Sequence, residues 1–259
     1  MKKILWTLAA LMMVGAASVL MTSCGDDEEN VPTGDNPEQT DPSTDDDDPV
    51  PGDGSDTHEY VDLGLPSGTL WATCNIGASS PEEYGDYFAW GETEPKSDYS
   101  WITYKWCNGS YNSLLTKYCT ESTNGIVDDK TQLELEDDAA YVNWGNKWRI
   151  PGKTQFSELF NSNYTTTEWV TQNGVLGCKT TSRTNGNSIF LPAAGYRDGT
   201  SLKQVGSIGE YWTCAFYYRS QPRYARFLYF SSEYHPTTDY TDARDRCRGL
   251  SVRPVCMSN

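Results

Sequence analysis

The chain has 259 residues, of which 36 are acidic and 20 basic, so its formal net charge at pH 7 is −16. Phosphate binding needs a sizeable basic surface, so this charge argues against a nucleic-acid partner. Without the two lysines at the start and the thirteen acids of residues 25–58, residues 59–259 carry only −5. These roughly 200 residues are enough for one domain with a sizeable core.

Residues 1–23 predict an export signal. Lys2 and Lys3 precede an apolar run over residues 4–20, which is too short and too close to the start to be a convincing membrane span. The run ends in small residues followed by Cys24, and this ending resembles the lipidation motif of bacterial lipoproteins. Cys24 is therefore predicted to carry the lipid. The alternative is ordinary cleavage nearby, with Cys24 left as a thiol.

Residues 24–58 predict an acidic, disordered tether behind the lipidated cysteine. Residues 25–58 hold thirteen acids and no lysine or arginine, with many prolines and almost nothing apolar. Such a segment cannot bury enough surface to offset its ordering entropy. The aspartates at 45–48 lack the spacing of a calcium loop, so no calcium is expected there. The acidic run 25–29 resembles the surface-export signal of Bacteroidota lipoproteins. That resemblance implies a lipid-anchored protein in the outer membrane, exposed at the cell surface.

Residues 59–259 are predicted to form a single domain that opens with a hairpin. Apolar and polar residues alternate over 60–65, a turn follows at 66–68, and residues 69–75 read as the partner strand. Residues 93–136 are polar and rich in turns, which predicts a long insertion dominated by loops.

Two helices are predicted. Residues 136–144 carry acids in the first turn, where the helix dipole favours them. The second helix starts with Gly152 at the N-cap, and Gln155 three residues later gives a weakened capping box. Its core-facing stripe is Phe156, Leu159 and Phe160.

Short strands and turns follow from residue 165. Asn185–Gly186 and Asp198–Gly199 mark tight turns, and residues 188–196 read as a core strand. Buried positions are predicted for Trp71, Trp90, Trp144, Trp148 and Trp212, and structural roles for Arg149 and Arg253. Seven cysteines remain in this part, without any Cys-x-x-Cys pair, so a zinc site is not expected. Their odd number leaves at least one thiol unpaired; Cys107–Cys119 and Cys214–Cys247 are candidate disulfides among several.

The last part of the chain, residues 209–256, predicts a recognition surface. It holds seven Tyr, seven Arg and five acids, so it is slightly basic within an acidic protein. Tyrosine offers a stiff amphipathic surface at low entropy cost, and arginine adds stacking and forked hydrogen bonds. For any single residue of this segment, the alternative is that it belongs to an ordinary polar surface and has no role in binding. The predicted ligand-binding residues are Tyr217, Tyr218, Arg219, Arg223, Arg226, Tyr234, His235, Tyr240, Arg244 and Arg246.

Catalytic groups are sparse. The only histidine outside the tether is His235, in a segment that reads as an exposed turn. Glu92 and Glu94 lie two residues apart in a loop, an arrangement more typical of surface carboxylates than of an acid pair. No catalytic residue, no cofactor and no metal are therefore predicted, and the chain is expected not to be an enzyme.

Several ordered motifs resemble the Fibrobacter succinogenes major paralogous domain family of Bacteroidota surface lipoproteins. The resemblance covers residues 59–256. Its motifs are YVDLGLPSG and LWATCN near the start, residues 85–94, WRIP at 148–151, LPAAGYR at 191–197, YWT at 211–213 and GLSVRPV at 249–255.

That family is similar to the formylglycine-generating-enzyme type of C-type-lectin-like fold. The resemblance implies an α+β domain with two helices, a small twisted antiparallel sheet, much loop, and ligand contacts near the C-terminal end. Cys247 and Cys256 lack the context of that enzyme's cysteine pair, and Lys96 stands where a lectin's calcium ligand is expected. Residues 209–248 resemble the variable segment of diversity-generating-retroelement targets.

These observations predict a surface-displayed, adhesin-like lipoprotein that binds a protein or a glycan through its C-terminal loops. A structural protein of the envelope or of a pilus is one alternative. A polysaccharide-active enzyme is the second.

Overall fold

The computed structural model describes residues 58–111, 114–234 and 241–258. The chain divides into two units, Met1–Asp48 and Pro49–Asn259, and every described residue lies in the second. The predicted signal, Cys24 and all of the predicted tether except His58 lie outside the described residues. The His58 ring stacks on that of Trp144, with 3.9 Å between ring centroids. None of the helices in the described part is long and apolar enough to cross a membrane.

Strands and loops dominate the described unit, with only two short α-helices, so the sheet-rich α+β class is confirmed. The helices are α1 (Ala139–Trp144) and α2 (Lys153–Leu159), and the 3-10 turns are η1 (Trp101–Thr103) and η2 (Leu135–Asp137). The strands are β1 (Tyr60–Asp62), β2 (Thr69–Ala72), β3 (Thr165–Gln172), β4 (Val175–Ser182), β5 (Ser188–Pro192), β6 (Tyr196–Asp198), β7 (Ser201–Lys203), β8 (Ile208–Phe216), β9 (Tyr224–Ser231), β10 (Thr241–Asp245) and β11 (Val255–Met257).

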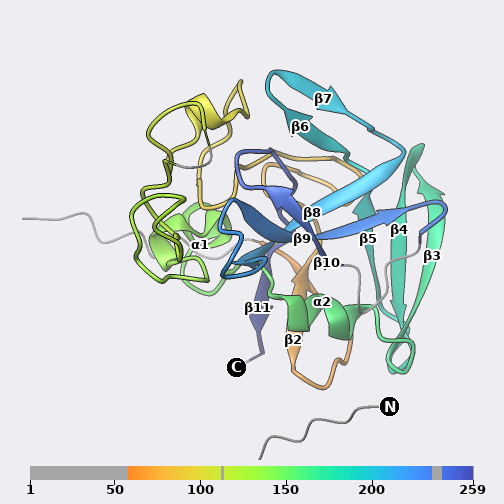
Figure 1. The fold of residues 1–259 in the computed structure, drawn as a ribbon. Helices are drawn as coiled ribbons and strands as arrows, with labels where there is room; N and C mark the ends of the chain where they lie inside the picture. Colours follow the sequence, from red (N-terminus) through yellow and green to blue (C-terminus); the bar gives the residue numbers. More distant parts are fainter. Residues whose placement is uncertain (1–57, 112–113, 235–240, 259) are drawn as a thin grey trace, which may run out of the picture. The chain divides into compact units, whose positions relative to one another are not determined.

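The strands form several small antiparallel sheets rather than the one small sheet that was expected. Their orders are β1-β2-β11, β10-β9-β8, β3-β4-β5 and β6-β7. The sheet of β8, β9 and β10 lies between the β3–β5 sheet and the loop-rich insertion, as Figure 1 shows. The predicted first hairpin is confirmed, with Tyr60 opposite Ala72. β11 pairs with the other edge of β2, so the first and last strands share one sheet.

The first predicted helix is shorter than expected. The backbone of Asp138 is extended, and its carboxylate accepts hydrogen bonds from the amides of Ala140 (2.9 Å) and Tyr141 (3.2 Å). Asp138 is therefore an N-cap, and it separates the 3-10 turn η2 from α1. The acids at 136–137 precede the α-helix instead of forming its first turn.

The second helix agrees with the prediction. The Gly152 amide donates to Gln155 Oε1 over 2.6 Å, which is half of a capping box because glycine has no side chain to return the bond. The predicted core stripe of Phe156, Leu159 and Phe160 is buried.

The core contains four of the five tryptophans that were expected there and, among the described residues, two arginines, Arg246 and Arg253. Four of the predicted tryptophans are buried: Trp71, Trp90, Trp148 and Trp212. Trp144 is only half-buried and packs against the edge of the core. Arg253 is fully buried and donates to Asn75 Oδ1 (2.9 Å) and to the carbonyls of Ala72 (3.2 Å) and Phe190 (3.0 Å). It ties β2 to β5 and has the structural role predicted for it.

All seven cysteines of the described region are unpaired thiols. The candidate disulfides Cys107–Cys119 and Cys214–Cys247 are therefore wrong. The thiols of Cys107 and Cys119 instead hydrogen-bond to main-chain carbonyls a few residues away. Burial raises the pKa of Cys247 to about 12. These thiols pack as small apolar groups.

Candidate functional site

The end of β8 brings two distant segments together. The pairing of β8 with β9 shifts register between Trp212 and Phe216, and such a bulge re-aims the residues beyond it. Residues 131–133 of the insertion join the strand there: the Leu133 amide donates to the Cys214 carbonyl (2.9 Å), and the Phe216 amide to the Thr131 carbonyl (3.1 Å). The insertion therefore lies beside the loop 217–223 that connects β8 to β9.

A hollow of about 300 Å³ lies at this junction. Its size is at the lower end of the range of small-molecule sites. Its lining residues are Thr131, Gln132, Ala215, Phe216, Tyr217, Tyr218 and Arg219. Three of the predicted ligand-binding residues, Tyr217, Tyr218 and Arg219, are thus brought together.

A fourth predicted residue, Arg226, packs against the two tyrosines. The rings of Tyr217 and Tyr218 meet edge to face with 4.2 Å between centroids. The Arg226 guanidinium lies 5.0 Å from the first ring and 5.4 Å from the second, within the range of a cation–π contact. Tyr218 remains 53% exposed. Arg226 therefore orients an aromatic pair of which one member faces solvent.

Arg219 connects the C-terminal loop to the insertion. Its Nη2 donates to Asp129 Oδ1 over 2.8 Å, and the side chains of both residues are 65% exposed. The Thr120 hydroxyl donates to the Arg219 main-chain carbonyl. One contact involves the side chain of Arg219, and the other involves its backbone.

The loop that carries Asp129 is itself held firmly. The Asp128 carboxylate accepts hydrogen bonds from the amides of Tyr118 and Cys119, both at 2.8 Å. Asp129 has a left-handed backbone with φ of 56°, a conformation that aspartate tolerates better than most residues. Sequence reasoning missed Asp129, Thr131 and Gln132 because they lie in a long loop with no periodic pattern.

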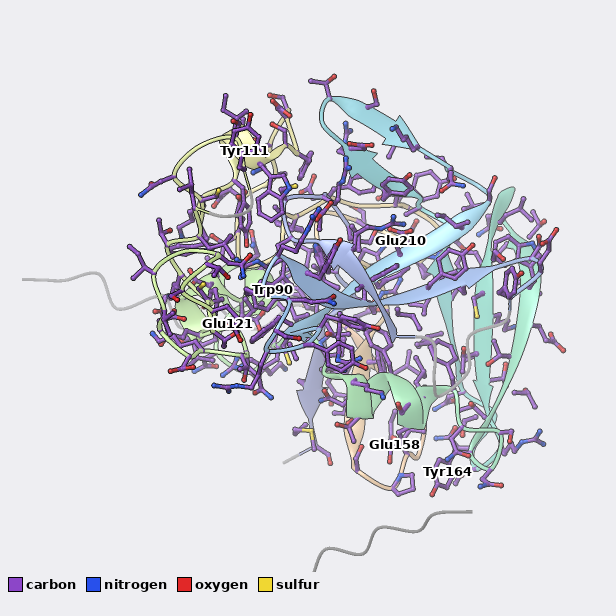
Figure 2. All side chains as sticks on the ribbon, in the orientation of Figure 1. Trp90, Tyr111, Glu121, Glu158, Tyr164 and Glu210 are labelled. Carbon is purple, nitrogen blue, oxygen red and sulfur yellow. The ribbon has the colours of Figure 1, made fainter. Side chains whose placement is uncertain are left out.

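Two other predicted arginines are held in ion pairs beside the sheet. Arg223 donates through Nε (2.9 Å) and Nη2 (2.6 Å) to Asp245 Oδ1. Arg244 binds the fully buried Glu210 through Nε and Nη2, and its guanidinium lies 4.6 Å from the ring of Tyr196. Glu210, which is labelled in Figure 2, belongs to β8. Both arginines are only partly exposed, and their charges are balanced within the domain.

The prediction that Arg246 is an exposed ligand contact is wrong, because its side chain is fully buried. Nη1 donates to the carbonyls of Lys117 (3.4 Å) and Tyr118 (3.0 Å), and the guanidinium packs over the rings of Trp90 (5.5 Å) and Tyr104 (5.6 Å). Arg246 anchors the insertion to the core.

The remaining predicted residues do not join the hollow. Tyr234 is 52% exposed, but it follows the far end of β9, whereas the hollow lies where β9 begins. His235 and Tyr240 lie outside the described residues. The described part of the predicted site therefore reduces to Tyr217, Tyr218, Arg219 and Arg226.

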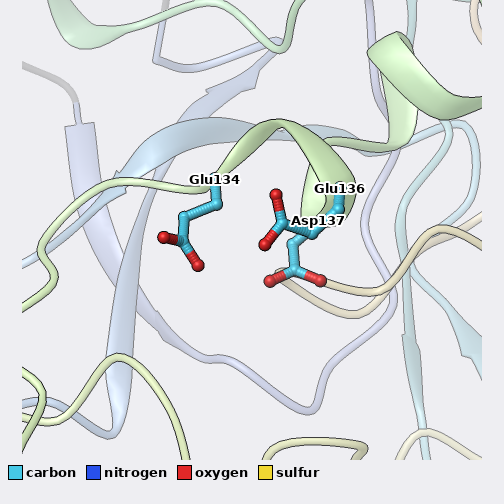
Figure 3. Close-up of side chains that lie close together, drawn as sticks. All are labelled: Glu134, Glu136 and Asp137. Atoms are coloured by element: carbon cyan, nitrogen blue, oxygen red, sulfur yellow. The ribbon is translucent and has the colours of Figure 1, made fainter. Parts of the chain in front are cut away.

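A cluster of three acids lies elsewhere in the insertion. The carboxylates of Glu134, Glu136 and Asp137 gather within reach of one ion (Figure 3). The ammonium of Lys117 already contacts all three, at 2.6, 3.5 and 2.6 Å. Lys117 and Lys130 lower the pKa of Glu134 to about 2. The cluster is therefore explained as a network of ion pairs.

Glu92 and Glu94 also differ from an acid pair in their surroundings. The Glu92 carboxylate is buried and accepts from Lys96 Nζ and from the Lys105 amide, both at 2.8 Å. Glu94 is exposed. These contacts give Glu92 a structural role in fixing the start of the insertion.

Comparison of the chain with protein-family models, with curated proteins and with solved structures gives no significant match. The geometry of the hollow therefore carries the functional argument.

Proposed function

We propose that this chain is a recognition protein displayed at the bacterial surface, which binds a protein or glycan ligand at the hollow between the insertion and the loop 217–223. In this proposal, Cys24 carries the lipid anchor in the outer membrane and residues 25–58 hold the domain away from it. The domain belongs, in the same proposal, to the Fibrobacter succinogenes major paralogous domain family with a C-type-lectin-like fold, and it acts by binding without catalysis.

The observation that supports a binding role is that exposed groups at the hollow are packed or hydrogen-bonded to their neighbours before any ligand binds. Tyr218 is half exposed yet packed against Tyr217 and Arg226, and Arg219 is held at both its side chain and its backbone. Groups that are ordered before binding lose less conformational entropy when a ligand arrives. Tyrosine and arginine are also the residues that contribute most at recognition surfaces.

The test is a binding screen with a paired variant. Cells that display the wild-type chain and cells that display the double variant Tyr218→Ala, Arg219→Ala are tested against arrays of glycans and secreted proteins. We expect a ligand that binds wild type and is lost by about tenfold or more in the double variant, which corresponds to about 1.4 kcal/mol.

The matched control is Tyr234→Ala, which removes an equally exposed tyrosine away from the hollow. It should bind like wild type. If the double variant retains every interaction of the wild type, the hollow is not the binding site.

A further inference from the structure

The lining of the hollow is rich in groups that both donate and accept hydrogen bonds. Thr131, Tyr217 and Tyr218 contribute hydroxyls, and Gln132 contributes an amide. The apolar residues of the lining are Ala215 and Phe216, and Phe216 is almost completely buried. Pockets that receive the central anchor of a protein partner are instead well packed and desolvated. This lining suits a ligand that carries hydroxyl groups around a small ring.

The charge on the lining residues themselves is compensated by a neighbour. Arg219 is the one charged residue of the lining, and Asp129 compensates it at 2.8 Å. Both side chains are 65% exposed, so the pair offers a carboxylate acceptor and guanidinium donors to a ligand at the same edge. A neutral hydroxyl that donates to the carboxylate or accepts from the guanidinium makes a charge-assisted hydrogen bond. The Asp129 carboxylate would repel an acidic ligand at this edge, so the site favours a neutral ligand.

The aromatic pair adds a surface for a C–H face. The Tyr218 ring is half exposed, and its orientation is fixed by its edge-to-face contact with Tyr217. The face of an aromatic ring carries partial negative charge, which attracts the weakly positive C–H hydrogens of a pyranose. The volume of about 300 Å³ is suited to one ring-sized unit.

We infer that the hollow binds a neutral pyranose, as a unit of a longer glycan. Tyr218 packs on the face of the sugar, and Gln132, Asp129 and Arg219 bind its hydroxyls. The inference rests on the proposed function and names the class of ligand that the same site takes.

The test uses the full chain and small sugars of known charge. Saturation-transfer NMR is recorded with the methyl glycosides of glucose, galactose, mannose and N-acetylglucosamine, and with methyl glucuronide as the acidic probe. We expect at least one neutral glycoside to bind with a dissociation constant on the order of 1 mM, more tightly than the glucuronide. Tyr218→Ala and Gln132→Ala should each weaken it by about tenfold, whereas Tyr234→Ala should bind like wild type.

Asp129→Asn probes the charge balance separately. This variant leaves Arg219 uncompensated, so binding of the glucuronide should rise relative to the neutral glycosides. Far-UV circular dichroism checks that each variant is folded.

The inference is overturned if none of the neutral glycosides binds, if Tyr218→Ala binds them as well as wild type does, or if the glucuronide binds best to the wild-type chain. A purified protein ligand whose binding is lost in the Tyr218→Ala, Arg219→Ala variant, together with no sugar binding, would overturn the inference and leave the proposed function standing.

Discussion

The Arg244 guanidinium passes over the Phe227 ring, at 5.1 Å, to bind the Glu210 carboxylate, with 2.9 Å between Nε and Oε2. Arg244 belongs to β10 and Glu210 to β8, so the pair spans the intervening strand β9. Glu210 is fully buried, whereas the Arg244 side chain keeps 30% of its exposure. A buried carboxylate without its partner is costly because the protein interior solvates charge poorly.

Arg244→Ala should therefore reduce the free energy of unfolding by about 3 kcal/mol. Urea denaturation followed by tryptophan fluorescence measures the loss. Arg219→Ala is the matched control, because it removes one member of an ion pair whose two side chains are both 65% exposed. This variant should lose less than about 1 kcal/mol of the free energy of unfolding. Equal losses for the two variants would contradict this account of the Arg244–Glu210 pair.

Arg246→Ala should destabilise the domain without acting through ligand contact. The change removes the hydrogen bonds to Lys117 and Tyr118 and leaves a cavity against the Trp90 ring. We expect a loss of about 2 to 4 kcal/mol in urea denaturation. Arg246→Lys should recover only part of it, because an ammonium lacks the planar fork. A variant with wild-type stability and abolished ligand binding would show that Arg246 belongs to the binding surface after all.

The buried thiols should make stability fall at high pH. Burial raises the pKa of Cys178 and of Cys247 from the ordinary 9.0 to about 12. The pKa of each thiol is higher in the folded chain than in the unfolded chain. Its contribution to the free energy of unfolding is therefore fully present below pH 9.0 and is lost as the pH rises towards about 12. Within this pH window, ionisation of each thiol should lower the free energy of unfolding by about 1 kcal/mol per pH unit.

Urea denaturation across that window checks the thiol effect. The double variant Cys178→Ala, Cys247→Ala should lose stability less steeply with pH than wild type does. Its absolute stability will be lower because of the missing sulfur atoms, so the comparison is one of slopes. An unchanged slope would show that the two thiols ionise equally in the folded and unfolded chain.

Gly125→Ala should disturb the insertion on which Asp129 depends. The glycine has φ of 147°, and a Cβ there would lie 2.0 Å from the Leu115 carbonyl oxygen. We expect a loss of about 3 kcal/mol in urea denaturation, from the clash together with the backbone strain. Gly186→Ala is the control: its φ is 78° but nothing lies within 4 Å, so only about 1 to 2 kcal/mol of strain is expected. If both variants lose the same amount, the close packing at Gly125 does not matter for stability.

Local signals in the sequence predicted local structure well. Gly152 and Gln155 mark the start of α2, and the alternation after Tyr60 predicts the first hairpin, because short-range hydrogen bonds and side-chain period decide both. The sequence predicted one small sheet, whereas the structure has several, because strand order depends on pairings between distant segments. The first helix begins later than predicted, because the Asp138 carboxylate caps the amides of Ala140 and Tyr141 and so fixes the N-terminus there.

At the candidate site, the sequence alone did not predict which polar residues are exposed. Tyr218 and Arg246 both read as polar residues of the C-terminal segment, yet one is half exposed and the other fully buried. The difference comes from the insertion, whose carbonyls at Lys117 and Tyr118 cover Arg246. The contribution of Asp129 follows from the same long-range contact, and its loop has no periodicity from which its place could be inferred.

The pairing of β11 with β2 places Val255 opposite Trp71, about 180 residues apart in the sequence, so one edge of β2 depends on a distant segment. Without residues 255–257, this edge of β2 would have no partner strand, and Trp71 would lose its cross-strand neighbour Val255. Deletion of residues 255–257 would therefore remove a structural strand, so a sequence label should leave β11 intact.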